Sequence, residues 1–305
     1  MSAVLTVVIV NWNTRAFLSR CLKSVLDDSH SIAISIIVVD NASTDDSVEM
    51  VQRNFPQVVL VQNKTNVGFV KANNQGLAMA TGEWVLFLNP DTEIQPGALQ
   101  TMLAFGQSHP SVGAIGPQLL NGDGSLQNSV FQFPNPWRLF LEYIVSSSLA
   151  ARLERPRAVR DPVRAVDVIR GACLLARRDL VRDCGGMNER IFMYAEETDL
   201  CYKIARRGFA RMLLADCRVI HHERQSVRQQ DEWLMRYHYV RSTIIFVAEN
   251  YPEFLARICI DIIKVGLYTR RALAHLQKGA SRRIEWTKLI EDLASIPGWK
   301  KGTRS

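Results

Sequence analysis

The sequence lacks the patterns by which several large classes of protein are identified. It has no G-x-x-x-x-G-K-[ST] loop, and no G-x-G-x-x-G follows a predicted strand, which argues against the classical nucleotide-binding enzymes. The six cysteines form no C-x-x-C pair and have no zinc-like spacing, so we interpret them as buried thiols in a reducing compartment. No apolar run reaches the roughly 18 residues that a membrane-spanning helix needs.

The composition is that of a globular protein. The chain has 305 residues, of which 47% are hydrophobic and 22% charged, enough for the core of one large or two modest domains. The formal net charge of +7 is concentrated at the C-terminal end, where residues 251–305 contain 11 Lys and Arg against 5 Asp and Glu. No DNA- or RNA-binding motif accompanies this charge, so we expect no nucleic-acid partner.

Strands and helices alternate over roughly the first 90 residues, which is typical of an α/β domain with a mostly parallel sheet. Residues 4–10 are predicted to form a buried strand rather than a signal peptide, because they follow no basic segment and precede no small-residue cleavage site. The periodicity predicts further strands at 34–39, 58–61 and 85–88, and helices at 15–27, from Ser43 or Thr44 as cap to about Asn54, and at about 69–80.

The strand predicted at Val85–Leu88 ends at Asn89-Pro90-Asp91-Thr92. An apolar run of this length suits a strand buried on both faces, and open parallel sheets bind ligands at the carboxyl ends of their strands. Asp91 is therefore a candidate contact to a metal ion or another ligand. A polar turn without a function is the alternative, and this stretch alone does not decide between the two.

Other predicted strands also end in polar residues. Asn11 and Asn13 follow the first strand, and Asp40 follows the second, where a simple turn before a helix is the structural alternative. Asn63–Phe69 is a polar loop whose Gly68 enters a helix, a geometry that can present backbone N–H groups to an anion.

The middle of the chain departs from this alternation. After a helix at about 97–108, residues 112–120 are predicted to form a strand, with a hairpin turn at 121–124 and a return strand at 126–133. Residues 135–166 contain three prolines, and five arginines lie between Arg152 and Arg164. This composition predicts a long loop with one short helix, and a functional lid and a solvated insertion are both open interpretations.

Two polar clusters follow a strand predicted at 168–176. Glu196, Glu197 and Asp199 open a helix that is expected to end at Gly208. They are candidates for acid–base chemistry, or they complement the positive end of the helix. His221 and His222 end a strand-like stretch, either as metal ligands or as ordinary strand-end residues.

Beyond residue 229 the pattern becomes helical. Residues 254–276 combine a wide apolar face with interleaved arginines and lysine, and an amphipathic basic segment of this kind suits an anionic membrane surface. Packing on the rest of the chain or in a homodimer is the alternative. We therefore expect one domain at residues 1–229 and a C-terminal helical region at 230–305.

Four separated segments together resemble the family 2 glycosyltransferases of the GT-A fold, and further segments resemble the rhamnosyltransferase-type branch of that family. The resemblance covers roughly residues 4–226. The four segments are Val8–Asn13, Val38–Asp45, Asn66–Phe69 with Ala72–Asn74, and Leu88–Thr92. The further segments are Gly171–Cys173, Gly185-Gly186, Phe192–Tyr194 and Glu196–Cys201.

The resemblance implies an inverting sugar transfer from a nucleotide-diphosphate donor to an acceptor hydroxyl, assisted by Mg²⁺ or Mn²⁺. Asp91 matches the metal-binding acid of the D-x-D motif of the family, whose first acid is replaced here by Asn89. His221 corresponds to a histidine that some members add as a metal ligand, with His222 as the alternative. Glu197 matches the general base, with Glu196 and Asp199 as alternatives.

The implied nucleotide-sugar pocket contains Asn11, Asn13, Asp40, Asn66, Gly68, Lys71, Asn89 and Asp91. The sequence departs from the family at Phe131 and Gln132, where related sequences often carry arginines, so no phosphate or acceptor contact is inferred there. The donor is expected to be linked to dTDP, UDP or GDP, with dTDP-rhamnose as the first hypothesis. The acceptor is expected to be a polysaccharide or lipid-linked glycan, and the protein to work in the cytoplasm, peripherally at the inner face of the membrane.

Two other functions are compatible with a similar sheet. A sugar-nucleotidyltransferase should carry a glycine-rich, basic loop after its first strand, and Asn11-Trp12-Asn13 is not one. A non-catalytic sugar-nucleotide-binding protein would keep Asp40 and Asp91 but lose the base. Glu197, which stands where the family has Asp, leaves this second alternative open.

Overall fold

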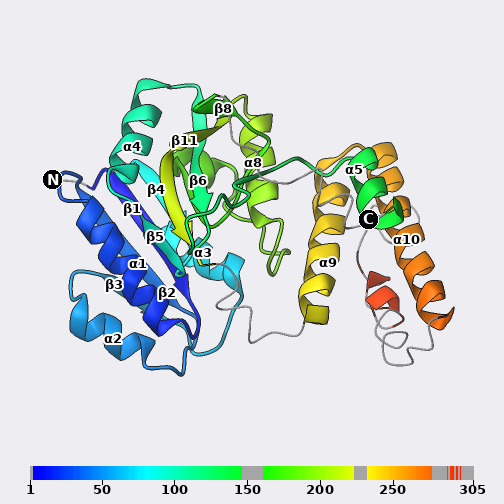
Figure 1. The fold of residues 1–305 in the computed structure, drawn as a ribbon, viewed down its shortest axis with the longest axis horizontal. Helices are drawn as coiled ribbons and strands as arrows, with labels where there is room; N and C mark the ends of the chain where they lie inside the picture. The colour runs from blue at the N-terminus through cyan, green and yellow to red at the C-terminus, as the bar shows by residue number, and fades with distance from the viewer. Residues whose placement is uncertain are drawn as a thin grey trace. The chain divides into compact units, whose positions relative to one another are not determined.

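The computed structural model describes residues 3–145, 161–222 and 232–276, and single positions between 287 and 296. These residues divide into two compact units, each described by itself (Figure 1). The sheet unit contains the described residues up to 132, with 161–192 and 196–222. The helical unit contains residues 133–145, 193–195 and 232–276. The boundary predicted between residues 229 and 230 falls outside the described residues.

The sheet unit is built on a mixed, mostly parallel sheet that has nine strands among the described residues (Figure 1). Strands β10, β5 and β8 run against the other six, because β10 is antiparallel to β4 and β6, and β5 and β8 are antiparallel to β11. The order is β3 (Val59–Gln62), β2 (Ile34–Asp40), β1 (Leu5–Asn11), β4 (Trp84–Leu88), β10 (Cys173–Arg177), β6 (Val112–Leu120), β11 (Ala210–His221) and β5 (Thr92–Ile94), with β8 (Val163–Ala165) on β11. Strands β7 (Val130–Phe131) and β9 (Val168–Ile169) form a separate pair.

Helices cover both faces of this sheet. One group packs into the main hydrophobic core and consists of α1 (Arg15–Asp28), α2 (Ser47–Asn54) and α4 (Ala98–Ser108). The other group lies on the opposite face and consists of α3 (Phe69–Met79), α7 (Arg178–Asp183) and α8 (Glu196–Arg206). Helix α3 approaches β1 so closely that a Cβ at Gly76 would lie 2.3 Å from a Val8 methyl carbon.

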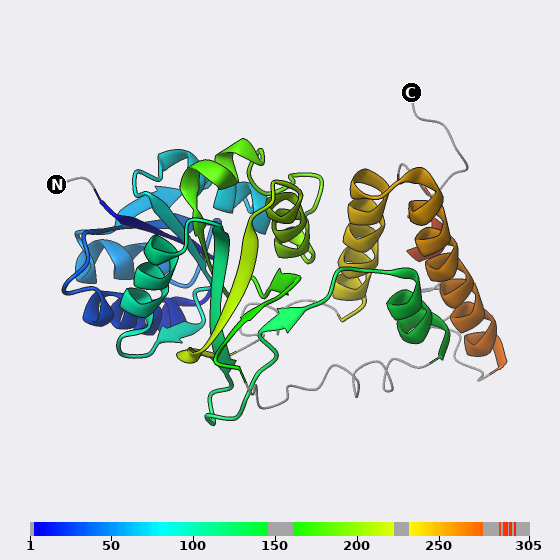
Figure 2. The same ribbon diagram turned by 90° about the horizontal axis from the view of Figure 1, so that it is seen from above.

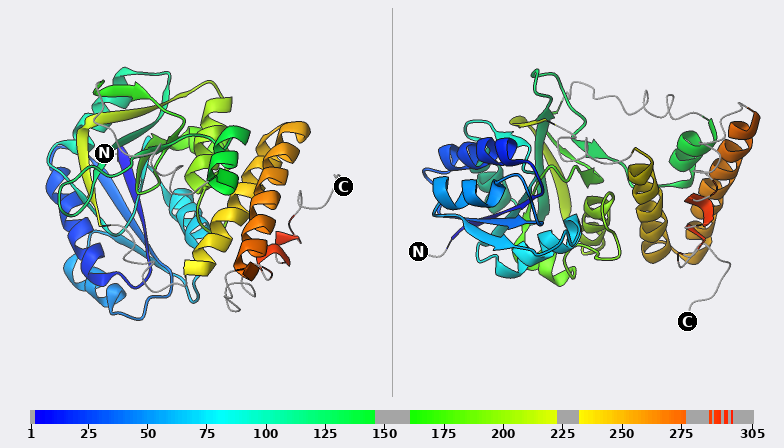
Figure 3. Two further views of the ribbon diagram at one scale, coloured as in Figure 1. Left: turned by 45° about the vertical axis from the view of Figure 1, so that its right-hand side comes forward. Right: turned by 90° about the horizontal axis from the view of Figure 1, so that it is seen from below.

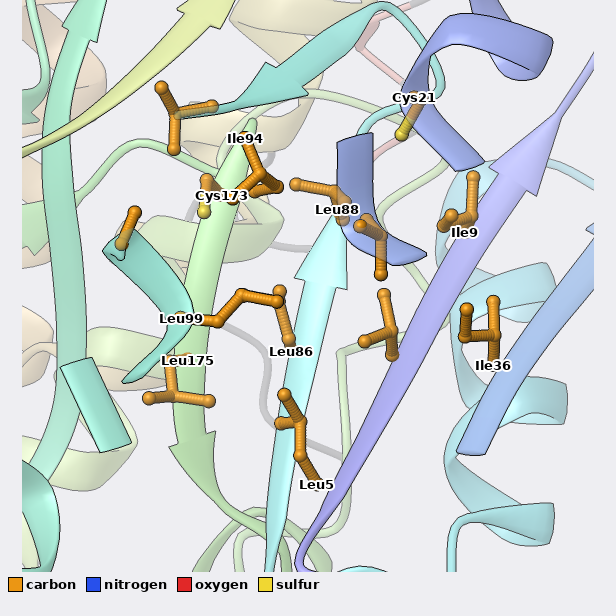
Figure 4. Packing of buried hydrophobic residues seen from close by; sticks show 14 of the residues in the cluster. Leu5, Ile9, Cys21, Ile36, Leu86, Leu88, Ile94, Leu99, Cys173 and Leu175 are labelled. Atoms are coloured by element: carbon orange, nitrogen blue, oxygen red, sulfur yellow. The ribbon is translucent and has the colours of Figure 1, made fainter. Parts of the chain in front are cut away.

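Strand β4 lies near the middle of the sheet, and all five of its residues are buried, as its apolar sequence predicts. Figure 4 shows Leu86 and Leu88 of β4 beside Leu5 and Ile9 of β1 in the main core. Burial of each such side chain contributes about 1.5–3 kcal/mol relative to exposure. This apolar layer holds the strands in register and brings the polar residues after β1, β2 and β4 to one edge of the sheet.

Three local predictions are wrong. Residues 168–176 do not form one strand, because Val168–Ile169 (β9) pairs with β7, whereas β10 begins only at Cys173 and belongs to the main sheet. Helix α2 begins only at Ser47, after Asp46 with φ of 59°, and neither Ser43 nor Thr44 caps it. The return strand after the turn at 121–124 does not pair along β6, apart from one isolated bridge between Leu120 and Leu126. Strand β10 pairs only with Ala114 and Ile115, and the end of β6 receives Leu126 and the N–H of Gln127 before the chain forms β7, which pairs with β9.

The helical unit contains α9 (Glu232–Asn250) and α10 (Glu253–Leu276), which confirms the predicted C-terminal helices (Figure 3). A short helix, α5 (Pro136–Phe140), and a π-helical turn at Leu141–Val145 pack against α10 (Figure 2). A Cβ at Gly266 would lie 2.6 Å from the Cβ of Tyr143, so glycine permits this close contact. No described helix is long and apolar enough to cross a membrane.

The long loop predicted at 135–166 is therefore partly structured, since it contains α5, the π-helical turn and β8. Most of its arginines, from Arg152 to Arg160, lie outside the described residues. All six cysteines are free and buried, in agreement with their interpretation as buried thiols.

Candidate active site

The ends of β1 and β2 are joined by a buried polar network. Asn11 and Asp40 are neighbours in the parallel register, and Nδ2 of Asn11 donates to Oδ1 of Asp40 over 2.8 Å. The hydroxyl of Thr14 donates to Oδ1 of Asn11, and the backbone N–H of Ser43 donates to Oδ2 of Asp40. Asn11 thus fixes the orientation of the Asp40 carboxylate at the edge where open α/β sheets bind ligands.

Asn13 shapes the loop beside this pair. It has φ of 53°, and its Oδ1 accepts hydrogen bonds from the backbone N–H and the hydroxyl of Thr44. Its own N–H donates to the hydroxyl of Ser43, which also accepts from Nδ2 of Asn11. Ser43 and Thr44 therefore connect the ends of the two strands instead of capping a helix.

The loop before α3 is held in a conformation that requires glycine. Gly68 has φ of 92° and ψ of 157°, a region of backbone space essentially reserved for glycine. Its carbonyl accepts from Nδ2 of Asn41, and a Cβ at this position would lie 2.8 Å from the ring of Phe192. The N–H of Gly68 donates to Oδ1 of Asn66, so this amide is occupied within the loop. Lys71 follows in the first turn of α3 and is exposed.

Asp91 and His221 lie close together. In the strand order of the sheet, β11 and β5 are on the other side of β4 from β1 and β2. Oδ1 of Asp91 lies 3.4 Å from Nε2 of His221, and both side chains are at least nine-tenths buried. Strand β5 pairs with β11 at Thr92 and His221, and the N–H of His222 donates to the carbonyl of Asp91. The backbone pairing of β5 with β11 therefore sets the distance between the two side chains.

The second ring nitrogen of His221 faces an acceptor. Nδ1 lies 2.8 Å from Oε1 of Gln127, while Nε2 of Gln127 donates to Oδ1 of Asn121 and to the carbonyl of His221. Since Oε1 can only accept, Nδ1 must carry the proton. In neutral His221 the lone pair of Nε2 then points toward the Asp91 carboxylate.

This pair fits a divalent cation. Two neighbouring ligands of one octahedral cation, each about 2.1 Å from it, lie roughly 3 Å apart. A carboxylate oxygen and an imidazole nitrogen suit Mn²⁺ or Mg²⁺. Asn89 is two residues before Asp91. Its Oδ1 is buried and has no hydrogen-bond partner among the described residues. No three His, Cys, Asp or Glu side chains of the described residues come together, so a bound cation would need ligands from its donor or from water.

His222, the alternative ligand, faces elsewhere. Its Nε2 lies 2.7 Å from Oε1 of Glu93, and its ring packs against Phe17. The His222 ring is therefore occupied by Glu93, whereas the imidazole of His221 lies beside the Asp91 carboxylate.

The three acids at the start of α8 have different surroundings. Asp199 is fully buried and forms an ion pair of 2.7 Å with Lys203, one helical turn later. Oε2 of Glu196 and Oε2 of Glu197 are both buried without a hydrogen-bond partner among the described residues. Asp199 is thus neutralised within its own helix, whereas Glu196 and Glu197 interact with each other.

Burial raises the pKa of both glutamates. The pKa of Glu196 is well above its usual range, first because burial disfavours the charged form and then because Glu197 repels a second negative charge. Burial also raises the pKa of Glu197, while the backbone N–H groups and the Arg170 guanidinium beside it partly oppose this shift. Glu196 is accordingly the carboxyl that holds a proton more tightly, and Glu197 is the better candidate for a charged base.

Glu197 lies close in the fold to the Asn89 turn. Gly171 packs against the Glu197 side chain, and a Cβ there would lie 3.6 Å from the Cβ of Glu197. The next residue, Ala172, accepts a hydrogen bond of 2.9 Å from the N–H of Asn89. The chain at Gly171–Ala172 therefore connects the acidic helix to the segment that carries Asp91.

Residues 6–184, more than half of the chain, match the family model described as glycosyl transferase family 2. The chain belongs to glycosyltransferase family 2. It is a nucleotide-sugar glycosyltransferase of the GT-A fold, as the sequence motifs imply. This membership argues against a sugar-nucleotidyltransferase.

Two curated relatives illustrate the similarity of this glycosyltransferase to others. An N-acetylglucosaminyl-diphospho-decaprenol L-rhamnosyltransferase of Mycobacterium tuberculosis is 29% identical over 269 residues, which cover 82% of this chain and 86% of the relative. A low-salt glycan biosynthesis hexosyltransferase of Haloferax volcanii is 25% identical over 71% of this chain and 65% of the relative.

Solved structures share the fold at lower identity. A mannosyltransferase of Pyrobaculum calidifontis, in complex with GDP-Man and Mn²⁺, is 18% identical and superposes with a TM-score of 0.57 over 95% of this chain and 86% of the other. TarS of S. aureus, residues 1–349 in complex with UDP, is 17% identical with a TM-score of 0.61 over 95% of this chain and 79% of the other.

Sequence reasoning missed two residues at the site. Gln127 was assigned only to a hairpin strand, and nothing in the sequence connects it to His221, which lies 94 positions away. Arg170 was assigned to a strand, although it donates to the carbonyl of Asn128 and its charge acts on Glu197. Arg170 immediately precedes the glycine of the Gly171–Cys173 motif, which is the one signal that could have pointed to it.

Proposed function

We propose that this glycosyltransferase transfers rhamnose from dTDP-rhamnose, with inversion, to a hydroxyl of a sugar that is linked through a diphosphate to a membrane lipid. The observation that carries this proposal is the near full-length similarity to the rhamnosyltransferase of M. tuberculosis, whose name gives both the sugar and a lipid-diphosphate-linked acceptor. Site geometry supports the reaction class, and the relative supports the choice of sugar.

On the donor side, the proposed nucleoside contacts are the Asn11–Asp40 pair, Asn13 and the loop from Asn66 to Gly68. The Asp40 carboxylate is held in place by Asn11 and by the Ser43 amide, so it can accept a hydrogen bond from a base or ribose without reorienting. Lys71 is exposed at the start of α3, where a lysine can reach a phosphate of the donor.

Asp91 and His221 would hold a divalent cation, Mn²⁺ or Mg²⁺, and Asn89 would contact the cation or a water bound to it. When bound, the cation neutralises the charge that develops on the diphosphate leaving group. The residues themselves contribute a dry, preformed pair of ligands, since both side chains are buried and tied to backbone pairing between β5 and β11.

Glu197 is the proposed general base. An acceptor hydroxyl has a pKa far above neutrality, so it must lose its proton as it attacks the anomeric carbon, and a carboxylate within reach takes that proton. The raised pKa of Glu197 makes it a stronger base than an exposed glutamate. Glu196 keeps its proton and donates to Glu197, whereas Asp199 orients the helix through Lys203.

The helical unit is the proposed contact to the membrane that carries the acceptor, at its cytoplasmic face. It exposes several large apolar side chains, among them Trp137 at 67% and Phe254 at 76% of their surface. Arg257 and Arg271 lie on the same helix as Phe254, and the C-terminal residues 277–305 add further positive charge. Apolar side chains next to arginines suit an anionic lipid surface, and a second copy of the chain is the alternative partner.

Turnover of defined donors tests the function. The purified protein is incubated with GlcNAc-diphospho-prenol, Mn²⁺ and one of dTDP-rhamnose, UDP-GlcNAc or GDP-mannose. Product is expected only with dTDP-rhamnose and none after EDTA treatment. Transfer from another donor instead would contradict the choice of rhamnose while leaving the reaction class intact. Binding of a donor without any transfer would support the non-catalytic alternative.

A further inference from the structure

Gln127 contacts His221, although Gln127 itself has no role in the proposed reaction. Its side chain is buried and bonds to His221 twice: Oε1 lies 2.8 Å from Nδ1, and Nε2 lies 3.2 Å from the carbonyl oxygen of the same residue. Nε2 also donates to Oδ1 of Asn121 over 2.9 Å. Gln127 belongs neither to β6 nor to β11, so pairing between strands does not account for these bonds.

The orientation of the Gln127 amide is forced by its neighbours. Nε2 of Gln127 faces Oδ1 of Asn121 and the carbonyl oxygen of His221, and both oxygens are acceptors. If the amide were flipped, Oε1 would face these two oxygens without a donor, and the NH₂ group would face Nδ1 of His221. The backbone of Gln127 is also anchored, because its carbonyl accepts from Nε2 of Gln118 over 2.9 Å. The amide therefore presents an acceptor, and only an acceptor, to the imidazole.

We propose that Gln127 is a positioning residue that holds His221 in the Nδ1–H tautomer and so keeps the lone pair of Nε2 available to a cation. The inference rests on the proposed metal site at Asp91 and His221. It assigns Gln127 no contact with the donor sugar or the acceptor.

The alternative tautomer shows why such a residue matters. With the proton on Nε2, His221 would donate to Oδ1 of Asp91, and the two side chains would satisfy each other across 3.4 Å. A cation would then have to displace that proton and break the bond. Gln127 disfavours this closed pair, because the Nε2–H tautomer would leave Nδ1 and Oε1 as two facing acceptors.

The test compares Gln127→Met with Gln118→Met. Both replace a buried glutamine of the same segment by a side chain of similar length, but Gln118 bonds to Leu119, Gln127 and Ser129 and not to His221. Mn²⁺ binding is titrated by electron paramagnetic resonance in the presence of UDP or dTDP. We expect Gln127→Met to weaken Mn²⁺ binding by about 10–100-fold, as loss of a residue that supports a histidine ligand typically does. Gln118→Met keeps the acceptor at His221 and the bond from the Gln127 N–H to the Leu119 carbonyl, so it should weaken Mn²⁺ binding much less than Gln127→Met.

Gln127→Glu separates the acceptor from the amide. A carboxylate still accepts from Nδ1, so Mn²⁺ affinity should be largely kept, although the second oxygen would face Asn121 and the His221 carbonyl and lower the melting temperature. Equal weakening in Gln127→Glu and Gln127→Met would show that packing of the amide, and not its acceptor, matters, and would overturn the inference.

The tautomer can also be read directly in the unsubstituted protein. The histidine ring ¹⁵N spectrum of the metal-free protein, with the His221 signals identified by their loss in His221→Asn, should show a proton on Nδ1 and none on Nε2. A proton on Nε2 would overturn the inference. If instead Asp91→Asn and His221→Asn bind Mn²⁺ as tightly as the unsubstituted protein, the proposed metal site itself is wrong, which is a separate failure.

Discussion

Oδ1 of Asp91 and Nε2 of His221 lie 3.4 Å apart in the interior of the sheet unit, although Asp91 directly precedes β5 and His221 ends β11, a strand far away in the sequence. Two buried ligand atoms at this separation are suited to share one cation. In the proposed metal site, this pair would take the place of two acids on one turn, since the residue two positions before Asp91 is Asn89. The imidazole of β11 would thus provide the second protein ligand that the turn lacks.

Removal of either ligand should abolish the stabilisation that metal and nucleotide give together. At a ligand concentration 100 times Kd, binding stabilises the folded state by about 2.7 kcal/mol, which raises the melting temperature of a unit of this size by roughly 5–10 °C. We expect this rise with Mn²⁺ and dTDP, and its loss in Asp91→Asn and in His221→Asn. Glu93→Gln, which removes the charge beside His222 but keeps an acceptor there, is the matched control and should keep this rise. A full rise in Asp91→Asn would contradict the assignment.

Glu197→Gln should abolish turnover and leave donor binding nearly unchanged. Loss of a general base lowers kcat by about 10²–10⁴-fold, whereas the donor makes no proposed contact with this carboxylate. Because the pKa of Glu197 is raised, the acid limb of kcat/KM should lie above the ordinary glutamate value of 4.5. Asp199→Asn should lower the melting temperature through Lys203 and retain turnover. The opposite pattern, with activity lost only in Asp199→Asn, would move the base to that residue.

Glu196→Gln should stabilise the protein more at pH 8 than at pH 5. Glu196 has a raised pKa in the folded state, so its favourable contribution is present below the unfolded pKa and is lost as pH rises through the folded pKa. Glutamine stays neutral at both pH values and avoids this loss. The gain in melting temperature at pH 8 should exceed that at pH 5 by about 2 °C or more, the shift that 1 kcal/mol gives. Glu49→Gln, at an exposed site on α2, should show no such pH dependence; equal gains at both pH values would count against a buried, protonated Glu196.

Gly68→Ala should be more damaging than Gly97→Ala, although both glycines have positive φ. A Cβ at Gly68 meets the Phe192 ring at 2.8 Å in a conformation reserved for glycine, whereas a Cβ at Gly97 meets nothing within 4 Å. Urea unfolding should show a loss of about 1–3 kcal/mol or more for Gly68→Ala. Adding Phe192→Ala should restore only part of it, because the backbone strain persists. Complete restoration would mean that the ring contact alone explains the effect.

The exposed apolar residues of the helical unit should govern binding to lipid vesicles. Trp137→Ser and Phe254→Ser are expected to reduce cosedimentation with phosphatidylglycerol-containing vesicles, because each removes a large apolar side chain from the water-exposed surface. Met79→Ser, at a residue of the sheet unit that is 46% exposed, is the control and should sediment like the unsubstituted protein. A second copy of the chain would be favoured as the partner by a different result: all three variants sediment like the unsubstituted protein, and Trp137→Ser and Phe254→Ser elute as monomers in gel filtration where the unsubstituted protein elutes as a dimer.

Much of the fold could be predicted from the sequence because its signals are local. The apolar run of β4 and the helical spacing in α1 and α4 depend on neighbouring residues, and the structure confirms each of them. The return strand after β6 was predicted wrongly because a hairpin turn is a local signal, while the two neighbours of β6 come from distant parts of the chain. For the same reason, the packing of α5 against α10 had no counterpart in the sequence pattern.

The sequence by itself determined the family of this glycosyltransferase and the polar residues at the strand ends, because motif residues such as Asp40, Asp91 and Glu197 follow their own strands or open their own helix. Tertiary structure alone decided which neighbours these residues have. It assigned His221 to Asp91 and His222 to Glu93, joined Gln127 to His221, and neutralised Asp199 with Lys203. The physical reason is that the face on which a strand residue lies, and the residue it meets there, depend on sheet pairing between distant segments.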